Sequence, residues 1–177
     1  MSYFDETLVL LKEKKDPRSF MMDFNEKLRS INVVLGRHGS VVVIFHDTQN
    51  EEEKEYIELD EPVMDEYVID LLCSWKGLGF LSYRHPDFKL GVGISYLTWD
   101  DEYIDGFLIS FAGREVMFEG ADKHKELILK ISQCIDYEYI VGDVTDAFKK
   151  YIITEESLEE IKEHIMSNSF TIDSRTW

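Results

Sequence analysis

The chain of 177 residues has only two cysteines, three prolines and no long hydrophobic segment. Cys73 and Cys134 lie in apolar, helix-like patterns, which predicts buried, reduced thiols. A disulfide is the alternative, but no secretory context supports it. Near the N-terminus the apolar stretch Leu8 to Leu11 is only four residues long and follows acids. That is the wrong order for a signal peptide and too short for a membrane span, so we expect a cytoplasmic protein.

Basic side chains are scarce. The chain carries 19 lysines and arginines against 36 aspartates and glutamates, a formal net charge of −17. Binding of DNA or RNA through phosphates needs clustered lysine and arginine, so the composition argues against a nucleic-acid partner. The same charge argues against an anionic membrane surface. A basic protein partner, or solubility alone, remains compatible with it.

What the chain does contain is enough apolar material for a core. Hydrophobic residues make up 44% of it and aromatic residues 13%, which is too much for a disordered protein. A compact fold of this size buries about 70% of the surface that the unfolded chain exposes. No repeat, Gly/Ser linker or low-complexity tract divides the sequence. We therefore expect residues 1–177 to form a single globular domain.

The acidic residues are concentrated in one segment. Residues 1–46 contain seven basic and six acidic side chains, a net charge of +1. Residues 47–66 contain ten acids and one lysine, a net charge of −9. More than half of the excess charge therefore lies within twenty residues.

Apolar spacing predicts the helices. The clearest begins near Pro17, carries Phe20, Phe24 and Leu28 at helical spacing, and ends before Gly36 as a C-cap. Another, Val63–Trp75, places Val63, Met64, Tyr67, Val68, Leu71, Leu72 and Trp75 on one apolar face. The remaining predicted helices are Asp5–Lys14, Asp122–Cys134, Val144–Tyr151 and Glu155–Met166, the last with Thr154 as N-cap.

β-branched and alternating segments predict the strands. They are Ser40–His46 as a buried strand, Lys54–Asp60 as an edge strand, and a meander of Gly79–Arg84, Gly91–Trp99, Tyr103–Phe111 and Arg114–Glu119. Runs of helices and antiparallel strands, rather than regular alternation, indicate an α+β fold. We expect one mostly antiparallel sheet with helices packed on one face.

No motif for an active site is present. Gly91 and Gly93 begin like a dinucleotide fingerprint, but Tyr96 occupies the third glycine position and the segment opens a strand. No two histidines are three or four residues apart, and His85 is best explained by a turn. His46 at the end of a strand is interpreted as structural. We therefore assign no catalytic, cofactor-binding or metal-binding residue and expect no cofactor, although an active site assembled from distant residues stays open.

The carboxylates carry the strongest functional signal. One cluster is the 47–66 segment, and the other is a predicted hairpin flanked by Trp99 and Tyr103. One interpretation is a solvated face that keeps the protein soluble. The other is a docking surface for a cationic protein, with aromatic residues as anchors. The predicted partner-binding residues are Asp47, Glu51, Glu52, Glu53, Tyr56, Trp99, Asp100, Asp101, Glu102, Tyr103 and Asp105.

The chain resembles the immunity proteins of bacterial polymorphic-toxin and contact-dependent-inhibition systems. The resemblance lies in its overall character, small, very acidic and rich in aromatic residues, and in the meander-like segment Gly91–Glu119. It implies a cytoplasmic binding protein, not an enzyme, that blocks a basic toxin domain such as a nuclease. The alternatives are an enzyme with an unrecognised site and an acidic adaptor or regulatory protein.

Overall fold

The computed structural model describes residues 4–35, 41–46, 54–59, 63–74, 78–113, 121–142 and 156–177. The strands are β1 (Phe4–Lys15), β2 (Val34–Leu35), β3 (Val41–His46), β4 (Lys54–Leu59), β5 (Gly79–His85), β6 (Phe88–Leu97), β7 (Ile104–Ala112), β8 (Tyr137–Gly142) and β9 (Ile172–Asp173). The helices are α1 (Pro17–Ser30), α2 (Asp65–Cys73), α4 (Ala121–Ser132) and α6 (Leu158–Met166), followed by the 3-10 helix η1 (Ser174–Thr176).

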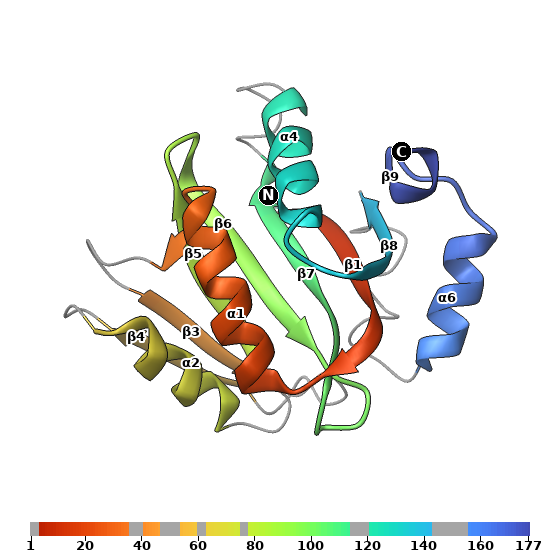
Figure 1. Cartoon of the computed structure of the whole chain (residues 1–177). Coiled ribbons are helices and arrows are strands. Elements are labelled where there is room, and N and C mark those ends of the chain that lie inside the picture. The colour runs from red at the N-terminus through yellow and green to blue at the C-terminus, as the bar shows by residue number, and fades with distance from the viewer. Residues whose placement is uncertain are drawn as a thin grey trace.

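All the described strands belong to one nine-stranded sheet, in the order β4-β3-β5-β6-β7-β1-β8-β9, with β2 paired to β5 (Figure 1). Every pairing between them is antiparallel. The predicted α+β class with one antiparallel sheet is therefore confirmed. The predicted edge position of the 54–60 strand is also confirmed, because β4 lies at one end of this order.

The helix predicted over Asp5–Lys14 is wrong. This segment is β1, which pairs with β7 on one side and β8 on the other. Its apolar residues alternate between two cores: Val9 and Leu11 pack in one and Leu8 and Leu10 in the other. A strand buried on both faces needs a continuous apolar run, and that run is what Leu8 to Leu11 supplies.

Helix α1 follows the prediction at its start but not at its end. Asp16 caps it by accepting a 3.0 Å hydrogen bond from the Ser19 amide, and Pro17 occupies the first turn. The helix ends at Ser30 with Ile31 as its C-cap, and the next residue, Asn32, adopts a positive φ of 65°. The predicted C-cap, Gly36, lies outside the described residues, and the chain has already entered β2 before it.

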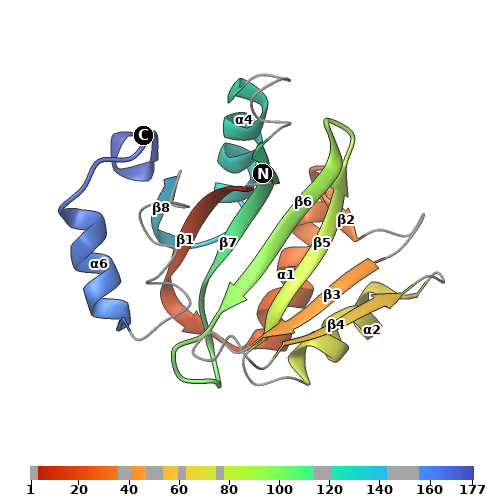
Figure 2. The same ribbon diagram turned by 180° about the vertical axis from the view of Figure 1, so that it is seen from behind.

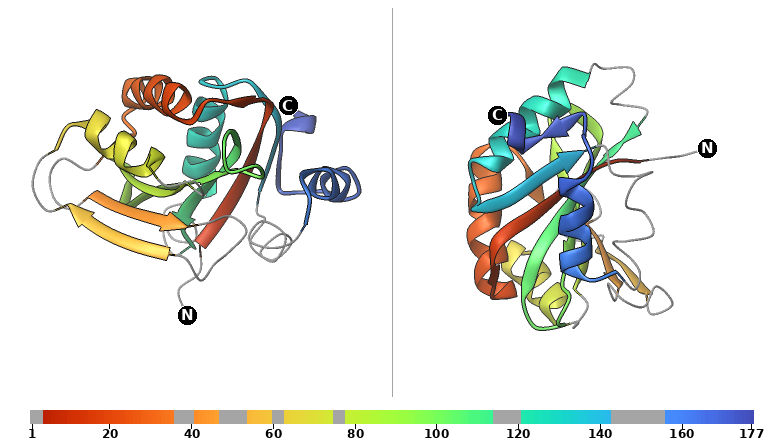
Figure 3. Two further views of the ribbon diagram at one scale, coloured as in Figure 1. Left: turned by 90° about the horizontal axis from the view of Figure 1, so that it is seen from below. Right: turned by 90° about the vertical axis from the view of Figure 1, so that its right-hand side faces the viewer.

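The prediction that all the helices pack on one face of the sheet is wrong. α1, α2 and α4 pack against one face, where the larger core gathers. Ile161 and Ile165 of α6 pack against Leu8, Leu10 and Leu108 on the opposite face. Figures 2 and 3 show α6 apart from the other three helices, beside β8 and β1. The central strands are apolar on both sides, so both faces require a cover.

Several contacts attach α6 to the rest of the fold. Lys162 of α6 forms a 2.9 Å ion pair with Glu138 of β8. Arg175 in η1 donates hydrogen bonds to Asp173 and to the carbonyl oxygens of Ile165 and Asn168. The C-terminal residues thus connect the end of α6 to the sheet.

The remaining predicted elements have mixed outcomes. The β5–β6–β7 meander and the helices at 122–134 and 155–166 are confirmed, the last starting at Leu158 with Ser157 as its N-cap. β8 and β9 were not predicted. The predicted strand at 114–119, the predicted helix at 144–151 and the predicted cap Thr154 lie outside the described residues. Within the described part of the chain, no helix is long and apolar enough to cross a membrane.

Candidate functional site

The second acidic cluster lies in the turn between β6 and β7, and Asp100 organises it. Oδ1 of Asp100 accepts hydrogen bonds from the amides of Glu102 at 3.0 Å and Tyr103 at 2.9 Å. Oδ2 accepts a 2.8 Å hydrogen bond from the ammonium of Lys14 at the end of β1. Aspartate is favoured in such turns because its side chain hydrogen-bonds the backbone two or three residues on. This carboxylate therefore stabilises the turn and joins it to β1.

These contacts set the protonation of Asp100. Partial burial alone would raise the pKa of this carboxyl group. The hydrogen bonds from Lys14, Tyr103 and Glu102 outweigh that effect and lower the pKa to about 2. Asp100 is therefore fully charged at neutral pH.

Two of the predicted partner-binding residues face inward. Asp105 is 5% exposed, and its Oδ2 accepts a 2.9 Å hydrogen bond from the Trp99 amide. Trp99 packs partly buried against the α6 core and donates from Nε1 to the carbonyl oxygen of Glu156 at 3.1 Å. The sequence suggested that both are displayed on the surface. The structure instead places them beneath the turn, where they support it.

Asp101, Glu102 and Tyr103 form the outer part of the turn and are exposed. Asp101 adopts a positive φ of 60°, a conformation that aspartate tolerates better than most residues. Tyr103 is 37% exposed. All three therefore lie at the surface, and their role in partner binding stays a prediction.

The sheet topology brings the first acidic cluster to the same edge. β3 and β6 both run antiparallel to β5, so they point in the same direction. β3 and β6 therefore end at the same edge of the sheet, with β5 between them (Figure 2). Because neighbouring strands lie about 4.8 Å apart, the last residues of β3 and β6, His46 and Leu97, lie about 10 Å apart. β4 begins at this edge too, since Lys54 is paired with His46.

We call this edge, formed by the ends of β3 and β6, the start of β4 and the turn Asp100–Tyr103, the acidic edge. The predicted residues Asp47, Glu51, Glu52 and Glu53 connect β3 to β4 and lie outside the described residues. Both strand ends that flank them belong to the acidic edge. The backbone of Tyr56 lies within β4, opposite Ile44. The strand ends that flank residues 47–53 therefore lie at the same edge of the sheet as the turn Asp100–Tyr103, although the two segments are distant in sequence.

Sequence reasoning misplaced the N-cap residue of α2 and one residue within this helix. Met64 and Tyr67 were predicted on its apolar face, but they are 72% and 54% exposed. The buried face is instead formed by Val68, Ile69 and Leu72. Methionine and tyrosine are enriched in protein interfaces, and this pair is flanked by carboxylates. The spacing of Val68, Ile69 and Leu72 is the sequence signal that could have distinguished the buried positions of α2 from Met64 and Tyr67.

Arg18 holds the carboxylates beside this exposed pair. Its guanidinium forms ion pairs with Glu66 at 2.6 Å and with Asp70 at 2.7 Å. Val63, Met64, Glu66, Tyr67 and Asp70 line a shallow hollow of about 380 Å³ there. The surface is acidic and apolar together, although one cation offsets part of its charge.

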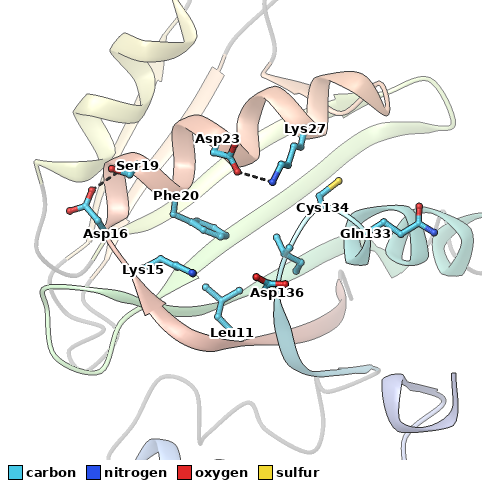
Figure 4. Close-up of a pocket in the computed structure, with 11 residues that line it drawn as sticks. Leu11, Lys15, Asp16, Ser19, Phe20, Asp23, Lys27, Gln133, Cys134 and Asp136 are labelled. Atoms are coloured by element: carbon cyan, nitrogen blue, oxygen red, sulfur yellow. Dashed lines mark hydrogen bonds and ion pairs between the residues drawn. The ribbon is translucent and has the colours of Figure 1, made fainter.

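A second hollow, of about 390 Å³, lies between α1 and the turn that leads into β8 (Figure 4). Phe20 and Leu11 contribute apolar surface, and Lys15 and Asp136 contribute charge. Its lining includes the thiol of Cys134. Both cysteines are free, as expected, but they are only partly buried.

The histidines form no metal site within the described ranges, where no three His, Cys, Asp or Glu residues gather to hold an ion. His85 is a turn residue, as predicted, because its Nδ1 accepts a 3.1 Å hydrogen bond from the Asp87 amide. His124 is 4% exposed, with Nε2 3.8 Å from a carboxylate oxygen of Asp5. The side chain of His46 is not among those described.

The glycines that resemble the start of a nucleotide fingerprint lie inside β6, as predicted. A Cβ on Gly93 would lie 2.2 Å from the ring of Phe80, so this glycine admits a neighbouring side chain rather than a phosphate.

Comparisons with protein-family models, with curated proteins and with solved structures gave no match.

Proposed function

We propose that this protein binds and neutralises a basic protein partner through the acidic edge, as an immunity protein blocks its cognate toxin. The observation that carries the proposal is topological: the strand ends flanking residues 47–53 and the turn Asp100–Tyr103 occur at one edge of the sheet. Two acidic segments that are distant in sequence can therefore act on one partner.

Electrostatics gives this arrangement a role. Lys14 offsets one carboxylate of the acidic edge, that of Asp100, and leaves most of the acidic charge of the turn and of residues 47–53 in excess. An excess of one sign at one edge attracts a partner of the opposite sign and speeds their encounter. The exposed rings of Tyr103 and Tyr67 would add contacts that form only in the complex.

The resemblance to immunity proteins supports a toxin domain as the partner. The α+β fold fits that expectation, and the wide acidic edge suits the basic cleft of an enzyme that acts on nucleic acid. An adaptor that is acidic only for solubility would not require its acids at one edge.

Binding kinetics test the proposal. The partner is first isolated by co-purification from the native cell and then measured at several ionic strengths. Changing Glu51, Glu52 and Glu53 together to lysine should slow association about tenfold, with little change in melting temperature. In the same assay Tyr103→Ala should leave association nearly unchanged and speed dissociation.

A matched control is available away from the acidic edge, where Glu26 of α1, Asp87 in the turn before β6 and Asp122 at the start of α4 are exposed. Changing these three to lysine alters the net charge equally but should slow association less. If both triplets slow association equally, or if association ignores both salt and the edge triplet, the acidic edge is not the docking site.

A further inference from the structure

The hollow between α1 and the turn before β8 combines apolar and charged surface in one small volume. Phe20, Leu11 and Ile135 supply the apolar part. Leu11 is 5% exposed and belongs to the main core, and Phe20 and Ile135 are partly buried against it. At about 390 Å³, the hollow lies within the usual range for small-molecule sites.

Two of the carboxylates that line the hollow already have partners. Asp16 accepts the hydrogen bond from the Ser19 amide that caps α1. Asp23 forms a 2.9 Å ion pair with Lys27 one turn further along the helix. Neither group is available to a ligand without losing a contact that stabilises α1.

Lys15 and Asp136 are different. Neither takes part in an ion pair with any described residue. Figure 4 shows them on opposite sides of Leu11, with Phe20 above. The residue Lys15 is partly buried and Asp136 is exposed, in a protein with a large excess of carboxylates. The hollow therefore presents one positive and one negative group across an apolar floor.

Side chains on the two facing walls of the hollow, α1 and the turn before β8, interact electrostatically. The pKa of Lys27 is raised, chiefly by its hydrogen bond to Asp23 and further by Cys134 and Asp136 on the facing wall. Burial raises the pKa of the Cys134 thiol, so this group stays protonated at neutral pH. Chemistry in the hollow is therefore expected to be reversible binding and not covalent capture.

We propose that this hollow binds a small zwitterion of the amino-acid class with an apolar side chain. The ligand's carboxylate would meet the ammonium of Lys15, and its ammonium would meet the carboxylate of Asp136. Its side chain would cover Phe20 and Leu11. Charge-assisted hydrogen bonds at both ends make such a ligand more favourable than one with a single charge, which leaves one protein group unmatched.

Three probes that differ by one group test this directly. L-phenylalanine carries both charges, 3-phenylpropionate lacks the ammonium, and 2-phenylethylamine lacks the carboxylate. L-phenylalanine should shift the backbone amide resonances of Leu11, Phe20 and Ile135, with a Kd of about 1 mM. Each of the other two probes should bind about tenfold more weakly.

Variants assign each end of the ligand. Lys15→Met should make L-phenylalanine bind no better than 2-phenylethylamine, and Asp136→Asn should make it bind no better than 3-phenylpropionate. Lys12→Met is a matched control, because Lys12 is exposed on the same strand and does not line the hollow. Unchanged melting temperatures would show that the variants remain folded.

The proposal is overturned if L-phenylalanine at about ten times that Kd does not shift these amides. Equal binding by a singly charged probe, or an unchanged preference in both variants, would also overturn it. The experiment uses no protein partner, so its outcome is independent of the proposed neutralising function.

Discussion

At the scale of single residues, Asp100 couples charge to stability. Its pKa of about 2 lies below the ordinary value of 3.8, so the native state holds this proton less readily than the unfolded chain does. A carboxyl group shifted in this direction stabilises the fold above about pH 4. The stabilisation is lost as the pH falls from about 4 to about 2.

Asp100→Asn should decrease the free energy of unfolding by about 1 kcal/mol at neutral pH, a modest value because the group is partly exposed. The side-chain oxygen of the asparagine can still accept hydrogen bonds from the backbone amides of the turn. The decrease in the free energy of unfolding therefore reports the loss of the ion pair with Lys14. Urea denaturation should show this difference shrinking towards zero near pH 2. Glu102→Gln removes another carboxylate from the same turn and controls for the general loss of charge, and a difference for Asp100→Asn that is constant with pH would contradict the assignment.

At the scale of elements, α2 was predicted correctly as a helix but with its face rotated. The predicted face included both Leu71 and Leu72, but Leu71 is only partly buried, whereas Leu72 is fully buried in the main core. Leu72→Ala should therefore decrease the free energy of unfolding by about 2–5 kcal/mol. Leu71→Ala should cost clearly less, about 1–2 kcal/mol.

Chemical denaturation of both variants checks this ranking. The two substitutions remove the same atoms from adjacent positions, so their difference reports burial alone. A larger loss for Leu71→Ala would mean that Leu71, and not Leu72, is the more deeply buried of the two. A loss below about 1 kcal/mol for both would mean that α2 is not part of the core.

At the scale of the whole molecule, the net charge of −17 opposes compaction by self-repulsion. Screening shortens the reach of these charges from about 30 Å at 0.01 M salt to about 8 Å at 0.15 M. We therefore expect sodium chloride over this range to raise the melting temperature by about 2–4 °C, equivalent to about 1 kcal/mol. Differential scanning calorimetry measures it directly.

A variant with Glu51, Glu52 and Glu53 changed to glutamine serves as the control for this experiment. It removes three charges from the most acidic segment, so its melting temperature should respond less to salt. A melting temperature that falls with salt, or an equal response in both proteins, would show that repulsion does not limit stability.

The candidate site was predictable only where local chemistry defines it. The turn Asp100–Tyr103 was identified because acids and aromatic residues cluster at a turn signal. The inward position of Asp105 was not predictable, because it depends on the Trp99 amide, which the hairpin brings within reach. The hollow between Lys15 and Asp136 was missed for the same reason, since only the pairing of β1 with β8 brings those positions together.

The sequence by itself determined the properties that are local or additive. Net charge is a sum over residues, the caps of α1 depend on Asp16 and Pro17, and the meander depends on alternation within each strand. The tertiary structure alone decided β1, because Leu8 to Leu11 is compatible with either a helix or a strand until partners lie on both sides. It also decided that α6 covers the second face and that the strand ends flanking residues 47–53 lie at the same edge as the turn Asp100–Tyr103. These outcomes depend on strand order and direction, which arise from pairing between distant segments and leave no local trace.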